Sequence, residues 1–247
     1  MRRPLRRLLA WTVQSVLLVS VAATALVAIL AVLPPPTTAF MLQDRVTRFG
    51  ASRSSAIAYT WKSWREISPQ LLIAVIAAED QRFPEHWGFD LQAIEKAAEH
   101  NRRGGSVRGA STLTQQVAKN LFLWSGRSYL RKGVEAGLTA LLETGWSKLR
   151  ILEVYVNVAQ FGDAVYGADA ASRRFFAKPA SRLTAAEAAL LAAVLPDPES
   201  LHVDRPSVYL RRRQRWILAQ MTGLGGPSFL RRVSPLLSAS REGSGSP

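Results

Sequence analysis

The chain has 247 residues, enough to bury a substantial core in one or two domains. Its formal net charge of +14 favours anionic partners such as nucleic acid, anionic lipid or a phosphorylated substrate. The absence of cysteine excludes disulfides and thiolate metal sites, and the three histidines lack metal-ligand spacing, so we expect no protein-held zinc site.

A long apolar segment near the N-terminus predicts a membrane anchor. Residues 8–33 contain no charged side chain and exceed the ~20 residues that cross a bilayer as a helix. Arginines dominate residues 1–7, so the positive-inside rule places this basic tail in the cytoplasm and the rest of the chain outside it. A cleaved signal peptide is the alternative, but its apolar core runs roughly 7–15 residues. We therefore expect a retained, single-pass anchor.

Residues 34–67, which open with Pro34–Pro36, are expected to form a linker and membrane-proximal segment, because three prolines cannot continue the helix. A helical domain then spans residues 68–237. Its first helix follows Ser68-Pro69, is mostly apolar, and delivers Glu79 and Asp80 at its C-terminal end. A carboxylate there opposes the helix dipole, which raises its basicity slightly.

Periodic apolar positions and caps predict the remaining helices. They are expected at 90–100, 114–123, 128–142, 148–158, from 184 to about 196, and at 208–221. No strand-like alternation follows the anchor, so the predicted fold is all-α, with a small, polar and disordered tail at 238–247.

Two segments leave alternatives open. Leu121–Trp124 is apolar throughout and reads either as core packing or as a lip that dips into lipid. Arg211–Arg215 is strongly basic and is expected to face solvent or lipid headgroups.

An acid-free run from Arg102 to Val134 carries the strongest chemical pattern. It contains several basic residues, and carboxylates stand on both sides, at Glu79 and Glu135. One carboxylate can act as a general base on an incoming hydroxyl, while cations neutralise the charge of a departing diphosphate. Such spacing alone is weak, because most acid and base pairs in a helical protein are solvated or form surface salt bridges.

Five segments in order resemble the five signatures of the family 51 glycosyltransferases, the peptidoglycan polymerases. They are Glu79–Asp90, Gly109–Asn120, Arg131–Glu135, Lys148–Gly162 and Arg174–Ala188. No Lys-Thr-Gly triplet of a penicillin-binding domain follows them, so the chain resembles the monofunctional members. The resemblance implies a lysozyme-like helical domain that joins lipid II units into β-1,4-linked glycan strands, with inversion and release of undecaprenyl diphosphate.

The resemblance also implies roles for individual residues. Glu79 matches the general base that activates the acceptor sugar's 4-hydroxyl, and Glu135 matches a second essential glutamate that orients the cations or a bound metal. Lys119 is the foremost candidate for stabilising the leaving group. Residues expected to bind the diphosphate and sugars are Lys119, Arg127, Arg131, Lys132, Gln115, Ser111, Thr114 and Asn120. Residues expected to shape the loop around Glu79 are Asp80, Phe83 and His86.

Asn157 and Glu153 are expected to tie helices together. Two residues depart from the family pattern, Gln160 where a glutamate is common and Ala164 where a glycine is common. No cofactor is required by the sequence, although a divalent cation, Mg²⁺ or Mn²⁺, is compatible with a diphosphate. No protein metal site is expected.

The expected partners are lipid II, the growing glycan strand and the bacterial inner membrane. The catalytic domain is expected in the periplasm, away from nucleic acid, and proteins of wall synthesis or division are compatible partners. Two other functions remain open. A degradative lytic transglycosylase or lysozyme shares the helical fold but has no use for a cationic diphosphate site, and a non-enzymatic membrane scaffold has no use for Glu79.

Overall fold

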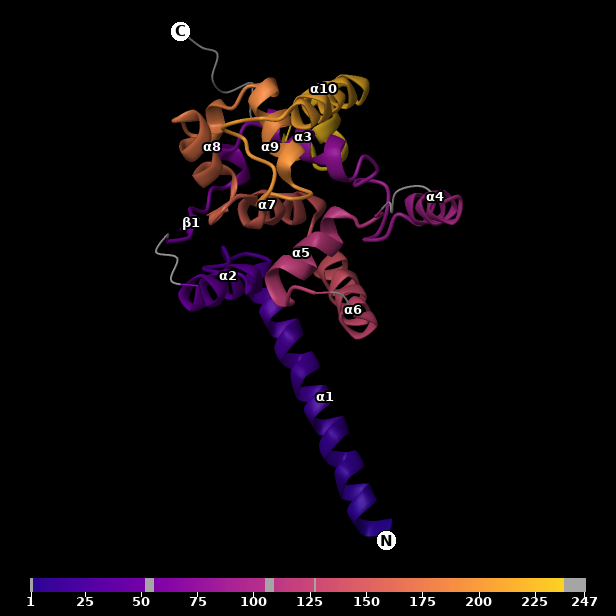
Figure 1. Ribbon diagram of the computed structural model, residues 1–247. Helices are drawn as coiled ribbons and strands as arrows, with labels where there is room; N and C mark the ends of the chain where they lie inside the picture. Colours follow the sequence, from indigo (N-terminus) through magenta and orange to yellow (C-terminus); the bar gives the residue numbers. More distant parts are fainter. Residues whose placement is uncertain (1, 52–55, 105–108, 127, 238–247) are drawn as a thin grey trace.

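Figure 1 shows the computed structural model of the chain, a helical domain carried on one long N-terminal helix. The structure describes residues 2–51, 56–104, 109–126 and 128–237. Helices dominate these residues, which confirms the predicted class. The helices are α1 (Arg2–Leu30), α2 (Ala39–Gly50), α3 (Pro69–Glu79), α4 (Leu91–Arg102), α5 (Leu113–Phe122), α6 (Tyr129–Gly145), α7 (Lys148–Val158), α8 (Ala168–Phe176), α9 (Ala185–Val194) and α10 (Val208–Gly223). Short 3₁₀ turns are η1 (Trp64–Glu66), η2 (Ala180–Arg182), η3 (Gly226–Arg232) and η4 (Pro235–Leu237).

The first helix combines an apolar span with a fixed attachment to the domain. Trp11–Leu30 is long and apolar enough to cross a membrane, and α1 projects away from the other helices (Figure 1). Its C-terminal end packs into the core through Val27 and Leu30. The Trp146 indole N–H donates to the Val27 carbonyl at 2.8 Å, and the Arg150 guanidinium donates to the Leu30 carbonyl at 2.9 Å. The Leu30 carbonyl is one that the helix end leaves unpaired, and both bonds fix the end of α1 to the domain.

The described parts of the segment expected to be a linker and membrane-proximal region, 34–51 and 56–67, contain helix α2 and strand β1. The Thr38 hydroxyl caps α2 by accepting from the Met41 amide, and the Met41 side chain is fully buried. Tyr59, in strand β1 (Ala58–Tyr59), donates from its hydroxyl to the Pro35 carbonyl at 2.6 Å. The Gln43 side-chain amide donates to the Leu123 carbonyl at 3.0 Å, a contact distant in sequence that holds α2 against the domain.

Helix α3 forms the centre of the core. Its residues 71–77 are all buried, and its neighbours include α9, which is also apolar and largely buried. A helix that is apolar on all sides must be surrounded by other elements. Helix α5 packs against both α6 and α7. The C-terminal end of α3 meets the first turns of α5, where Asp80 and Glu79 accept hydrogen bonds from the Leu113 amide and the Gln116 side chain.

A three-stranded sheet accompanies the helices. Strand β1 pairs in parallel with β3 (Val165–Tyr166), which pairs antiparallel with β2 (Gln160–Gly162). In the turn between β2 and β3, Ala164 adopts φ +56°, in the left-handed region that favours glycine. The turn therefore keeps a backbone conformation suited to the family's usual glycine, although an alanine occupies it.

Local capping explains most helix boundaries. Ser68 caps α3 ahead of Pro69, Thr184 and Glu187 form the predicted capping box of α9, and Thr112 caps α5. The predicted helices are present to within a few residues, whereas α2 and α8 were not predicted. The tail 238–247 lies outside the described residues.

Candidate active site

The structure places Glu79 at the last position of α3, as predicted. Its side chain retains 16% exposure, so the carboxylate is largely buried yet still reachable. One oxygen accepts a hydrogen bond from the Gln116 amide nitrogen at 3.0 Å. The other lies 3.4 Å from the Arg213 guanidinium of α10. Glu79 is thus held from two sides, by α5 and by α10.

Burial raises the pKa of the Glu79 carboxyl above its ordinary value. The hydrogen bond from Gln116 and the charges of Arg213 and Lys119 oppose this shift, and the Asp80 charge adds to it. A carboxylate with a raised pKa is a stronger base than an exposed glutamate, which suits proton abstraction near neutral pH.

Gln116 is a site residue that the sequence analysis missed in favour of Gln115. The Tyr155 hydroxyl donates to the Gln116 amide oxygen at 3.0 Å, which turns the amide nitrogen toward Glu79. Gln115 is buried and forms the capping box of α5 with Thr112. The signal available in the sequence was helical spacing, because Gln116 lies one turn before Lys119 and Asn120 on the same helix.

Arg213 corrects a second expectation. We predicted that the arginines of 211–215 face solvent or lipid headgroups, but Arg213 is half-buried and contacts Glu79. Arg211, Arg212 and Arg215 are exposed.

The loop after α3 is held by contacts of Asp80 and Phe83. One Asp80 oxygen accepts from the Leu113 amide at 3.0 Å, and the other lies 2.8 Å from His86 Nε2. Phe83 is fully buried, and the Lys148 ammonium lies 4.7 Å from its ring centroid. These contacts join the end of α3 to the start of α5 and so fix the backbone that carries Glu79.

The second glutamate has a different environment. Glu135 is buried in α6, where Arg131 donates to one carboxylate oxygen at 2.8 Å and Lys132 donates to the other. Both of its oxygens are therefore occupied by cations on the same helix. It is placed to orient Arg131 and Lys132.

The Lys119 ammonium lies within range of the charges of both Glu79 and Glu135. Burial lowers the pKa of the Lys119 ammonium below its ordinary value, with Arg131 and Lys132 acting in the same direction and Glu135 and Glu79 opposing it. Its ammonium lies 5.4 Å from the centroid of the Phe40 ring in α2. Since the charges of both glutamates act on this one group, the basic residues and the two acids share one region.

Other predicted site residues occupy varied positions. Ser111 is exposed and Asn120 is half-buried. Thr114 is fully buried, and its hydroxyl donates to Glu143 at 2.5 Å, so in this conformation it has no surface to offer a sugar. Arg127 lies outside the described residues.

The fourth-signature residues that were expected to be structural make such contacts. The Asn157 side-chain amide bonds both the amide and the carbonyl of Lys62 at 2.8 Å. Glu153 accepts from the Trp64 amide at 2.9 Å. Both residues tie α7 to the segment around η1.

No group of three or more His, Asp or Glu side chains arranged to hold a metal occurs within the described ranges. Glu135, the acid expected near the diphosphate, already has both oxygens paired with protein cations. That no cofactor is needed, with Mg²⁺ or Mn²⁺ compatible, remains a prediction.

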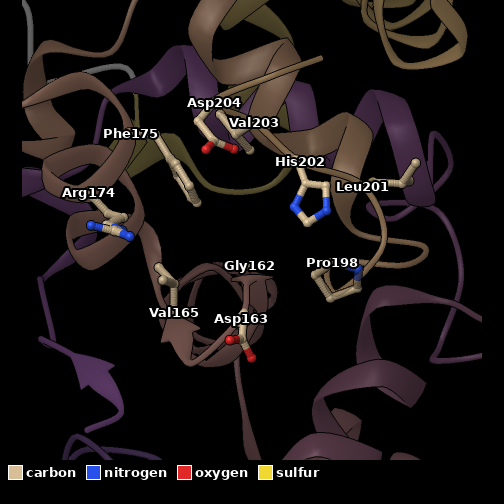
Figure 2. Close-up of a pocket in the computed structure, with 10 residues that line it drawn as sticks. All are labelled: Gly162, Asp163, Val165, Arg174, Phe175, Pro198, Leu201, His202, Val203 and Asp204. Carbon is tan, nitrogen blue, oxygen red and sulfur yellow. The ribbon is translucent and has the colours of Figure 1, made fainter. Parts of the chain in front are cut away.

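A separate cavity of about 210 Å³ lies between the β2–β3 hairpin, α8 and the loop at 198–204 (Figure 2). Arg174, Phe175, His202 and Asp204 are among its lining residues, and none of the predicted site residues is. It is therefore distinct from the region around Glu79 and Lys119.

Comparison with known proteins agrees with this arrangement. The profile of the family described as transglycosylase matches residues 44–222. A biosynthetic peptidoglycan transglycosylase of Klebsiella oxytoca is 59% identical over 207 residues, covering 83% of this chain and 86% of the relative. Proteins of the same name from Citrobacter koseri and Salmonella heidelberg are 57% and 56% identical over 208 residues, covering 83% of this chain and 86% of each relative. The chain belongs to the transglycosylase family.

Proposed function

We propose that this chain is a peptidoglycan glycosyltransferase that polymerises lipid II into β-1,4-linked glycan strands with inversion, releasing undecaprenyl diphosphate during cell wall synthesis. The observation that carries the proposal is that the Glu79 carboxylate and the Lys119 ammonium lie in the same region. Gln116, which binds Glu79, and Lys119 are three residues apart on α5, roughly 4.5 Å along the helix axis. A base and a leaving-group cation are thus supported by adjacent turns of one helix.

The reaction follows from these positions. Glu79 takes the proton of the acceptor sugar's 4-hydroxyl, and that oxygen bonds to the donor's anomeric carbon. The bond from this carbon to the diphosphate breaks, and its electron pair leaves with the diphosphate. Attack from the face opposite the leaving group inverts an α-linked donor into a β-linked product. Lys119 and Arg131 neutralise the departing charge, and Glu135 holds Arg131 and Lys132 in place.

The apolar span of α1 supports a membrane-bound reaction. Helices α2 and α6 flank the end of α1 (Figure 1). Phe49 on α2, Leu130 on α6 and Trp124, which follows α5, are large apolar side chains exposed to solvent. Within Leu121–Trp124, Leu121 and Leu123 are buried, so core packing accounts for them. We place α1 in the bacterial inner membrane with its basic N-terminus in the cytoplasm, which puts the domain in the periplasm.

A degradative enzyme is the main competitor, because a buried glutamate with a raised pKa also suits a general acid. The cations around Lys119 argue against it, since hydrolysis of finished wall releases no diphosphate. The test incubates the purified full-length chain separately with lipid II and with finished cell wall. Conversion of lipid II into polymer, with the wall left intact, is the expected result. Solubilised wall with unchanged lipid II would refute the proposal.

A further inference from the structure

Helix α10 carries a row of side chains on the face that meets the end of α3. Arg213 contacts Glu79, and Gln220 accepts a hydrogen bond from Gln81 at 3.1 Å, so both positions of α10 face the catalytic end of α3. Tyr209 and Trp216 lie four residues before and three residues after Arg213. Residues at these spacings share one face of a helix. Tyr209, Arg213, Trp216 and Gln220 therefore form one row, which we call the α10 row.

The two aromatic residues of the α10 row are exposed to solvent. Tyr209 is 58% exposed and Trp216 is 45% exposed, although large aromatic side chains usually bury most of their surface. They are separated by two helical turns, roughly 10.5 Å along the axis, which is comparable to the length of a disaccharide. An aromatic pair across this distance can contact a disaccharide along its length, because the C–H groups of sugar rings pack against aromatic side chains.

Arg213, between the two aromatic residues, keeps hydrogen-bonding capacity. Its contact with Glu79 is long, at 3.4 Å, and its Nε is shielded from solvent and has no acceptor in the described part of the chain. A buried donor without a partner is costly, and a sugar hydroxyl next to Glu79 would pair with the guanidinium after a small side-chain movement.

We infer that the α10 row is a carbohydrate-binding face that holds sugar rings of the acceptor beside Glu79. This inference rests on the proposed function and specifies its acceptor side. Tyr209 and Trp216 stack on the rings, and Arg213 binds a hydroxyl between them. A lipid surface is the other ligand that takes exposed aromatic and arginine side chains. Figure 1 argues against it, because α10 lies at the end of the domain farthest from the projecting α1.

The first experiment measures binding without catalysis. The full-length chain is titrated with the β-1,4-linked tetramer of N-acetylglucosamine, and binding is followed by saturation-transfer NMR. Trp216→Ala and Tyr209→Ala are each expected to weaken binding about 3- to 10-fold, in line with aromatic packing energies. Trp216→Phe keeps an aromatic ring and should retain most of the affinity for the tetramer. It serves as the control that a change at this position leaves the chain folded. Trp124→Ala, which removes an aromatic side chain of 49% exposure outside α10, should leave tetramer binding unchanged.

The second experiment uses lipid II polymerisation. Trp216→Ala should raise KM several-fold with little change in kcat, because the ring binds the acceptor but does not take part in the proton transfer. Wild-type affinity for the tetramer in both alanine variants, or no binding by the wild-type chain, would overturn the inference. So would weaker binding of the Trp216→Ala chain to anionic phospholipid vesicles with tetramer binding unchanged. If both alanine variants polymerise lipid II with a normal KM, the inference about the α10 row is wrong and the proposed function stands. If the wild-type chain binds the tetramer but forms no polymer from lipid II, the proposed function is wrong and the carbohydrate-binding face stands.

Discussion

Glu79 and Glu135 are the same residue type in two opposite environments. Glu135 is buried among its own helix's cations, with both oxygens paired to Arg131 and Lys132. Glu79 has one hydrogen bond to a neutral amide and one long contact to Arg213, and burial raises the pKa of its carboxyl. A carboxylate that is fully paired holds cations in place, whereas one that is under-paired can accept a proton. This difference supports the proposal that Glu79 is the general base and that Glu135 holds Arg131 and Lys132 in place.

The largest effect is expected when the base is removed. Glu79→Gln preserves the shape and the contact with Gln116 but cannot accept a proton, so polymerisation of lipid II should fall about 100- to 10,000-fold. Glu95→Gln, an exposed position on α4, is the matched control and should retain full activity. Polymer formed at the normal rate by Glu79→Gln would remove the residue from its assigned role.

Lys119 is the group on which both glutamates act, and its loss should rank second. Lys119→Met keeps the length of the side chain but removes the charge that meets the departing diphosphate. We expect kcat to fall about 100- to 1,000-fold, in the range of one lost transition-state donor. Lys96→Met on the exposed face of α4 serves as the control. Equal activities of the two variants would contradict the cationic leaving-group site.

Stability should separate the two glutamates in opposite directions. Glu135→Gln leaves Arg131 mostly buried without its counter-charge, so unfolding should become easier by roughly 3 kcal/mol, near the low end for a broken buried pair because Lys132 is half exposed. Glu99→Gln, which breaks an exposed i,i+4 pair, should have little effect. Denaturant unfolding measures the free energy of unfolding of both variants. Equal decreases would mean that Glu135 does not hold Arg131 and Lys132 in place.

Glu79→Gln should instead stabilise the chain near neutral pH. Because the pKa of Glu79 is raised in the folded state, its proton-linked stability is present at low pH and is lost as pH rises through that pKa. The neutral amide avoids the cost of a buried charge. The melting temperature should therefore exceed that of the wild type at pH 7 by about 2–4 °C for each kcal/mol recovered, and the gap should close in acid. A gap that widens in acid would reverse the assigned sign.

Much of the fold was predictable because its signals are local. Ser68-Pro69 and the Thr184–Glu187 capping box mark helix starts within a few residues of chain. Helix α2 was missed although Thr38 gives it a local cap, and its packing depends on distant contacts, such as the Gln43 side-chain amide that donates to the Leu123 carbonyl. The small sheet was missed for a similar reason, since β1 pairs with β3 across more than a hundred residues.

The candidate site also combines residues with local sequence signals and residues whose contacts are distant in sequence. The motif order pointed to Glu79, Glu135 and Lys119, and the charges of both glutamates act on Lys119. The partners of Glu79 were harder to predict. Arg213 comes from α10, 134 residues later in the chain, and nothing local distinguishes it from Arg212. The choice between Gln115 and Gln116 depends on which side of α5 meets α3, and this is decided by packing.

The smallest effect should come from Arg213. Its positive charge lowers the pKa of Glu79, so Arg213→Gln should raise that pKa further and move the acid limb of kcat/KM to higher pH. Arg212→Gln, on the exposed side of the same helix, should leave the limb in place. A limb that moves toward lower pH would show that the contact between Arg213 and Glu79 does not operate in solution.

The most direct test of the account is the pH dependence of kcat/KM for lipid II in the wild-type chain, measured beside Glu79→Gln. An ionised, largely buried Glu79 predicts that activity falls as pH drops through a single midpoint above the ordinary glutamate pKa of about 4.3. The residual activity of Glu79→Gln should lack this limb. An identical limb in both proteins, or a wild-type midpoint at or below the ordinary value, would contradict the assignment of Glu79 as the base.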